Sequence, residues 1–407
     1  MIYITFTGIT KYSQIDYFYE NSENIIVNSR YVQEAVMKQY GDKINKMYVF
    51  VTNAEDCEKN YENIKKIVVE QYPNILINKI YYDTNISFDE LLNKIIQEIN
   101  IGEKAKLILG ISNTFRYFPL SVVQLLPYIQ AYKGVNIKYI FNGKYNKETQ
   151  TGELQDITDC YFDSQVIRYL VQFKQTLRVP NQLENIYNDE IKKLLIEMRK
   201  INDERKHSNI YNELNCFKKI YLKSLALSET ETIYKIYLKD IISELSWTQK
   251  NNIYVQMNDM AKYMLDKGYY QHAVTILDCN RVVITSALIK GEGLFSGKKI
   301  DLMEESRKLI NAIDGRYEGE YKEKILSEET RQRMDSVFKK GVPTTCSIKN
   351  FSDIRNIIDH GLSLVSSGNI DKIRDEICTV FYDYQNKLNK IAKFKKIWLD
   401  NPKYLYD

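Results

Sequence analysis

The chain has 407 residues, which is long enough for two or three domains with cores of their own. It is 44% hydrophobic and 27% charged, and its net charge is only +4, which excludes a disordered chain and a strongly basic nucleic-acid binder. Any nucleic acid must therefore be bound by a local group of residues, because the molecule as a whole provides no strong positive field.

Six cysteines are scattered along the chain without a CxxC pair, so the sequence lacks the spacing of a zinc ribbon or a redox pair and indicates a reducing compartment. The opening run MIYITFTG predicts a buried strand and not a signal peptide, and no apolar run reaches the length of a membrane span. We therefore expect a cytoplasmic protein without a membrane partner.

Residues 1 to about 145 alternate short β-branched runs with helical patterns, which is typical of βαβ units and a mostly parallel sheet. The clearest helix begins after Ser87, because Ser87 and Glu90 have the spacing of a capping box and apolar residues follow at helical spacing. The predicted strands are Ile2–Thr7, Met47–Thr52, Ile75–Tyr81, Lys106–Ile111 and Val135–Phe141.

From about residue 152 onward the composition favours helices. No glycine occurs between Gly152 and Gly268, and Pro180 lies in the best candidate linker, the run LRVPN, because proline disfavours helix at the residue before it. The predicted fold class is α/β plus all-α: an N-terminal Rossmann-like domain with a parallel sheet, followed by a helical domain.

Two polar loops follow the first and fourth predicted strands. In an open parallel sheet, ligands bind beyond the carboxyl ends of the strands where the strand order reverses, and that point lies between these two strands if the sheet is built outward from the first. The loops offer hydroxyls, backbone donors and a guanidinium that suit a phosphodiester. The candidate ligand-binding residues are Thr7, Gly8, Ser112, Asn113, Thr114 and Arg116.

These loops also have an interpretation without a ligand. Thr7, Gly8 and Ser112 are then turn and cap residues, and Arg116 forms a surface ion pair. The spacing by itself does not choose between the two interpretations. Neither loop has the glycine fingerprint of a dinucleotide or nucleoside triphosphate site, which argues against an ordinary NAD or ATP enzyme.

The helical half contains a second polar group, in the run NFSDIRNIIDH. The apolar residues of this run form one stripe of a helix, so Arg355, Asn356, Asp359 and His360 lie on the other side. An arginine and a histidine without a carboxylate pair suit the transesterification of RNA, in which His360 transfers protons and Arg355 neutralises the charge that develops on the phosphate. That reaction needs no metal ion.

A structural interpretation of the same run pairs Arg355 with Asp359 on a solvated helix face and gives His360 no role. Short spacings of this kind also arise by chance, so the run is a weak signal by itself and depends on the rest of the chain.

Both halves of the chain resemble known families. The run from Ile111 to Gly143 and the opening ITFTG resemble CARF domains, the CRISPR-associated Rossmann folds. The run RNIIDH is similar to the Arg-Asn-x-x-x-His signature of HEPN ribonucleases, and the run from Gly268 to Leu288 resembles the first part of the same domain. A CARF-like half joined to a HEPN-like half is similar to the ancillary ribonucleases of type III CRISPR systems.

The resemblance implies a homodimer that cleaves single-stranded RNA in antiviral defence once cyclic oligoadenylate binds. It implies that Arg355, Asn356 and His360 are catalytic and that no cofactor besides this activator takes part. The implied domains are a CARF-like domain over residues 1–178, a helical linker region over 179–248 and a HEPN-like domain over 249–407.

One departure from the family pattern concerns the activator. Many relatives have Thr-His-Gly where this chain has Ser112, Asn113 and Thr114. The neutral side chains of this loop are poor bases near neutral pH, so we expect the CARF-like half to bind its activator and to degrade it slowly or not at all.

Two other functions stay open. The first is a non-catalytic CARF-type sensor or regulator whose helical half binds a partner, and the grouping of Arg355, Asn356 and His360 argues against it. The second is a nucleotide-dependent enzyme of small-molecule metabolism, against which the missing glycine fingerprints argue.

Overall fold

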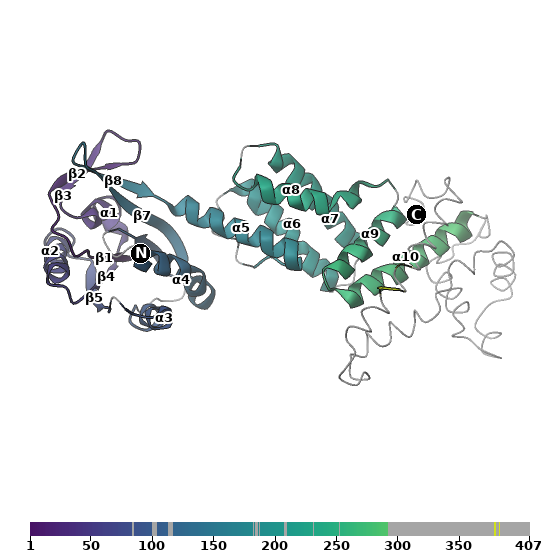
Figure 1. Ribbon diagram of the computed structural model, residues 1–407, viewed down its shortest axis with the longest axis horizontal. Helices are drawn as coiled ribbons and strands as arrows, with labels where there is room; N and C mark the ends of the chain where they lie inside the picture. Colours follow the sequence, from purple (N-terminus) through teal and green to yellow (C-terminus); the bar gives the residue numbers. More distant parts are fainter. Residues whose placement is uncertain are drawn as a thin grey trace. The chain divides into compact units, whose positions relative to one another are not determined.

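The computed structural model describes residues 1–83, 85–99, 104–112, 117–181, 183, 186, 188–206, 210–230, 232–251, 253–291, 378, 379 and 382. They divide into two compact units (Figure 1). The first is Met1–Val166 with Glu184–Tyr187, and the second begins at Ile167 and takes in the described helices from Asn188 onward. Each unit is treated by itself below.

The first unit is built on one sheet. In the described part of the chain, the sheet has eight strands in the order β3-β2-β8-β7-β6-β1-β4-β5. Neighbouring strands run parallel except at the pairs β2–β3 and β7–β8. The strands are β1 Ile2–Phe6, β2 Ile15–Tyr19, β3 Ile25–Ser29, β4 Lys46–Val51, β5 Leu76–Tyr81, β6 Lys106–Gly110, β7 Asn136–Asn146 and β8 Thr151–Asp156.

Helices cover both faces of this sheet, which makes the first unit a three-layer α/β structure (Figure 1). Alternate residues of β1 divide between the two cores: Ile2, Ile4 and Phe6 pack in one, and Tyr3 packs in the other. The first core contains residues of α3 Phe88–Gln97, α4 Tyr117–Lys133 and the start of α5 Thr158–Thr176, and the second contains residues of α1 Val32–Tyr40 and α2 Glu55–Gln71.

The second unit is helical in its described part, where α6 packs on α7, α7 on α8 and α9 on α10. Its core includes a buried ion pair with a third partner: Glu213 has no exposed side-chain surface, and its carboxylate oxygens lie 3.2 Å from Arg205 Nε and 2.5 Å from His272 Nε2. The helices are α6 Asp189–Lys206, α7 Ile210–Ser228, α8 Lys235–Glu244, α9 Ile253–Asp266 and α10 Tyr270–Gly291.

These observations confirm the predicted fold class, α/β plus all-α with a mostly parallel Rossmann-like sheet. All five predicted strands form, with ends within a residue of the prediction except for the last, which continues to Asn146. The linker run LRVPN stays a prediction: α5 ends at Thr176 just before it, but the two compact units divide between Val166 and Ile167, inside α5, and residues 177–181 belong to the second unit. The predicted domain limits at 178 and 248 stay predictions.

One expectation about the chain is wrong. The helical composition was expected to begin near residue 152, but Thr151–Asp156 forms β8, and β2 and β3 were not predicted at all. β2 and β8 carry no run of β-branched residues, and the run in β3 is only three residues long; the three strands complete one side of the sheet next to β7. Within the described ranges, no helix has the length and apolar character needed to cross a membrane.

Candidate functional site

The strand order places the carboxyl ends of β1 and β6, which precede the two predicted ligand loops, side by side. β4 and β5 continue the sheet on one side of β1, and β6, β7, β8, β2 and β3 continue it on the other. The switch point predicted between the first and fourth strands is therefore confirmed at β1 and β6. Thr7 and Gly8 follow β1, and Ser112 follows β6, at the same edge of the sheet.

Thr7 is buried, and its polar groups bond to other parts of the protein. Its backbone N–H and its hydroxyl both donate to the carbonyl oxygen of Phe50, at 3.1 and 3.2 Å. The hydroxyl oxygen also lies 2.8 Å from the sulfur of Cys57. Thr7 thus ties the end of β1 to β4 and to α2, and it fixes where the next residues leave the sheet.

Gly8 and Ser112 are also buried, and each is held by a hydrogen bond. The Gly8 carbonyl accepts from Asn60 Nδ2 at 2.9 Å, and the Ser112 hydroxyl oxygen accepts from the backbone N–H of Gly143 at 2.5 Å. Ser112 therefore connects the end of β6 to β7. The remaining predicted site residues, Asn113, Thr114, Arg116, Arg355, Asn356 and His360, lie outside the described residues.

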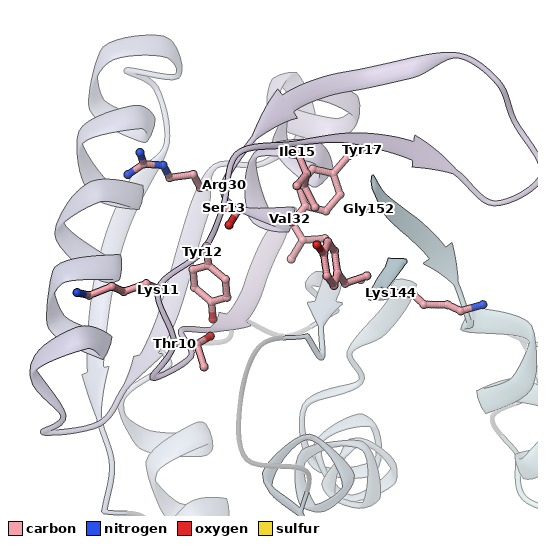
Figure 2. Close-up of a pocket in the computed structure, with 12 residues that line it drawn as sticks. Thr10, Lys11, Tyr12, Ser13, Ile15, Tyr17, Arg30, Val32, Lys144 and Gly152 are labelled. Atoms are coloured by element: carbon pink, nitrogen blue, oxygen red, sulfur yellow. The ribbon is translucent and has the colours of Figure 1, made fainter. Parts of the chain in front are cut away.

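A pocket of about 310 Å³ opens next to these loops (Figure 2). Gly143, which lines the pocket, lies against Ser112 and Val32. A Cβ placed on Gly143 would lie 3.2 Å from the Ser112 hydroxyl and 2.8 Å from Cγ2 of Val32, which also lines the pocket. The lining residues are Thr10, Lys11, Tyr12, Ser13, Ile15, Tyr17, Arg30, Val32, Gly143, Lys144, Tyr145 and Gly152.

The pocket combines aromatic rings with positive charge. Tyr12 and Tyr17 contribute rings, while Lys11 and Arg30 extend from the walls to one side and Lys144 to the other (Figure 2). Lys144 Nζ lies 3.7 Å from a carboxylate oxygen of Glu153, so part of its charge is offset. The lining residues themselves include no carboxylate, and such a wall attracts an anion that carries a flat ring.

Tyr12 and Tyr17 of the pocket keep their protons at neutral pH. Burial raises the pKa of Tyr12 well above its usual range, and hydrogen bonds with Thr10 and the backbone of Gly8 oppose this only in part. Burial likewise raises the pKa of Tyr17 to about 12. Because the lining residues include no histidine, cysteine or carboxylate, the pocket suits binding rather than acid–base chemistry.

The sequence alone did not identify most of this pocket. The predicted loop after the first strand ends at Gly8, so Tyr12 was not among the predicted residues, and Arg30 and Lys144 reach the pocket from the end of β3 and from β7. These residues line the same pocket only because β2, β3 and β8 extend the sheet, and the sequence pattern did not predict these three strands. In the described part of the chain, no three His, Cys, Asp or Glu side chains converge as a metal site would require.

Comparisons with known proteins add one structural likeness. No protein-family model matches the chain, and no curated protein gives a significant match. Among solved structures, the chain is similar to Enterococcus italicus Csm6 bound to cyclic hexa-2'-fluoro-hexa-dAMP, with 12% identity over 99% of this chain and 96% of that chain. The TM-score of 0.38 is too low to establish the fold, which follows from the strand order of this chain itself.

Proposed function

We propose that the chain is a CARF–HEPN ribonuclease of type III CRISPR defence, which cleaves single-stranded RNA when cyclic oligoadenylate binds to its sheet domain. The observation that carries the proposal is the position of Thr7, Gly8 and Ser112 at the ends of the neighbouring strands β1 and β6, next to a pocket with tyrosine rings and three cationic side chains. A cyclic oligoadenylate offers the matching chemistry, since it repeats an anionic phosphodiester and a flat base.

The activator lies across the switch point in this proposal. Gly8 and Ser112 approach it together with Asn113, Thr114 and Arg116, and the Arg116 guanidinium pairs with a phosphodiester. Thr7 is included in the site as the residue that anchors the loop, because its hydroxyl already bonds to Phe50 and lies against Cys57. Tyr12 and Arg30 extend the contact surface into the pocket.

Catalysis belongs to the run RNIIDH in the helical half. His360 transfers the protons as the 2′-hydroxyl attacks its own phosphate, Arg355 neutralises the phosphorane charge, and Asn356 orients the phosphate. The new bond to the 2′-oxygen replaces the P–O5′ bond, so the step yields a 2′,3′-cyclic phosphate and a 5′-hydroxyl that takes up a proton. His360 and Arg355 supply the proton transfer and the charge neutralisation, so we expect the reaction to need no metal ion.

The protein acts as a homodimer whose paired sheet domains bind one two-fold symmetric ring. A ligand switches a protein only if it binds one state better than the other, so the ring favours the arrangement in which Arg355 and His360 of both chains form one site.

The deciding experiment measures cleavage of labelled single-stranded RNA in excess EDTA, with and without cyclic tetra- and hexaadenylate. We expect cleavage only with one of the rings. His360→Ala and Arg355→Ala should abolish it, a fall of at least about a thousandfold, since each removes a group that acts on the transition state. Asp359→Ala, on the same run, should change the rate by less than about threefold because its carboxylate takes no part in the proposed chemistry.

The same experiment separates the alternatives. Arg116→Glu should prevent activation because it replaces a phosphate partner with a repelling carboxylate. No variant should cleave RNA in the absence of a ring. Ring binding by the wild type without RNA cleavage would instead identify a non-catalytic sensor. Activity that EDTA removes and Mg²⁺ restores would contradict the metal-independent mechanism.

A further inference from the structure

One buried amide side chain on α2 holds the loop that follows β1. Asn60 is 6% exposed, and its Nδ2 donates to two carbonyl oxygens of the loop, at 2.9 Å to Gly8 and 3.0 Å to Thr10. Its Oδ1 accepts from the hydroxyl of Tyr31 at 3.3 Å. Both protons and the oxygen of the amide are therefore used, which leaves Asn60 itself no group for a ligand.

The same network reaches the wall of the pocket. Thr10 and Tyr12 line the pocket, and the Tyr12 ring meets the Tyr31 ring edge-on, with centroids 5.7 Å apart and planes at 75°. The Tyr31 hydroxyl in turn accepts from Asn63 Nδ2 at 3.1 Å. Asn60 thus fixes the backbone on one side of Tyr12 and the ring against which Tyr12 packs on the other.

Besides Asn60, the loop is held by Tyr12, whose ring packs against Tyr31 and whose hydroxyl bonds with Thr10 and the backbone of Gly8. The neighbouring residues Ile9, Thr10, Lys11 and Ser13 are exposed and bury little apolar surface. A solvent-facing loop of this kind samples many backbone conformations unless side chains from the core bond to it. Two carbonyls fixed by a single buried amide restrict those conformations at the point where the loop enters the pocket.

We propose that Asn60 is a positioning residue for activator binding: it holds the loop from Gly8 to Ser13 in the shape that accepts cyclic oligoadenylate without touching the ring. The inference rests on the proposed function. Ordering the loop before the ligand arrives removes a cost of binding, so Asn60 sets the affinity and not the rate of the activated enzyme.

Asparagine is the side chain that this position requires. An aspartate has the same shape but, as a carboxylate, it donates no hydrogen bond and brings negative charge against the Gly8 and Thr10 carbonyls. When protonated it regains one O–H donor. Asn60→Asp therefore removes the two donated hydrogen bonds without changing the volume of the side chain. It also makes the order of the loop depend on the protonation of the carboxyl, which wild type lacks.

The first measurement needs no ligand. Amide hydrogen exchange in the full-length protein should be at least about fivefold faster across residues 8–13 in Asn60→Asp than in wild type, with β1 and β4 unchanged. Asn78→Asp is the matched control, because it makes the same chemical change on β5. Equal exchange of the loop in wild type and Asn60→Asp would overturn the positioning role, whatever the protein binds.

The second measurement uses cyclic tetra- and hexaadenylate. The dissociation constant of the activating ring should rise about tenfold to a hundredfold in Asn60→Asp at pH 8, while RNA cleavage at saturating ring keeps the wild-type rate. Burial and the facing carbonyl oxygens raise the pKa of the introduced carboxyl, so the loss of affinity should shrink as the pH is lowered and the carboxyl takes up a proton. Asn78→Asp should show neither effect. A lowered saturated rate with unchanged affinity would contradict the proposal.

Two further outcomes remain informative. If Asn60→Asp does not fold, Asn60→Ser serves instead, because the shorter side chain loses both loop bonds without adding charge. If wild type binds neither ring, the proposed function fails, but the exchange measurement still decides whether Asn60 orders the loop.

Discussion

At the scale of single residues, the wall of the pocket depends on a glycine that leaves room for an aromatic ring. Gly152 of β8 pairs with Tyr17 of the parallel strand β2. A Cβ on Gly152 would lie 2.4 Å from two carbons of the Tyr17 ring and 3.0 Å from Ile15 Cδ1. One edge of the ring therefore occupies the space in which a side chain at position 152 would lie, and a tyrosine on one strand and a glycine on the next together shape the pocket.

Gly152→Ala should destabilise the first unit by about 1–3 kcal/mol, because the added methyl forces Tyr17 out of its position or separates β2 from β8. Urea unfolding followed by circular dichroism measures this loss. In a Tyr17→Ala background the same change should cost much less, since the ring that it meets is gone. Equal costs in both backgrounds would show that the contact with Tyr17 is not the cause.

At the scale of elements, α3 illustrates a local sequence signal that the structure confirms. The Ser87 hydroxyl accepts from the backbone N–H of Glu90 at 3.2 Å, and the Glu90 carboxylate accepts from the backbone N–H of Ser87 at 3.0 Å. The helix that follows buries Leu91 and Ile95 in the core of the first unit, and Ile99 just beyond its end is buried in the same core. The capping box and the apolar spacing both indicate a helix that begins after Ser87, which is why the sequence alone predicted this helix.

Ser87→Ala should lower the free energy of unfolding by about 1 kcal/mol, because the first turn of α3 loses its side-chain acceptor. Glu90→Gln is the matched control and should be nearly neutral, since glutamine also completes a capping box. Amide exchange of residues 88–91, measured in both variants, locates the effect. A loss spread evenly over the sheet would mean that the hydroxyl serves another purpose.

At the scale of the whole molecule, each unit buries an acidic group that must stay protonated. Burial raises the pKa of Tyr17 in the first unit to about 12, and burial together with the nearby Glu197 raises the pKa of Cys216 in the second to about 11. In the unfolded chain these groups ionise near their ordinary values of about 10 and about 9. The folded state therefore binds more protons above pH 9, and stability falls there as pH rises.

The ionisation of Tyr17 should thus leave the free energy of unfolding nearly unchanged at neutral pH and should lower it between pH 10 and pH 12. At pH 11 the contribution of Tyr17 is about 1 kcal/mol smaller than at pH 8. Comparing urea midpoints of wild type and Tyr17→Phe at both values isolates this effect, because other titrating groups cancel. The difference between the two proteins should shift with pH in favour of the phenylalanine variant.

The sequence by itself determined the elements whose signals are local. Five strands, the capped helix at Ser87 and the helical second half follow from periodicity and composition, and the switch point beside Thr7 and Ser112 follows from the rules of parallel sheets. The assignments of Arg355, Asn356 and His360 rest on motif resemblance and stay predictions.

The tertiary structure alone decided which side chains share the pocket. Arg30, Lys144 and Tyr12 line one pocket because β2, β3 and β8 extend the sheet beyond β7. Asn60 bonds to the Gly8 and Thr10 carbonyls only because α2 lies next to the loop. A helix can be predicted from residues three and four apart in the local sequence. A strand of mixed composition is stabilised by neighbouring strands that are distant in sequence, so its local sequence does not predict it. The sequence around β8 therefore does not predict that Gly152 accommodates the ring of Tyr17.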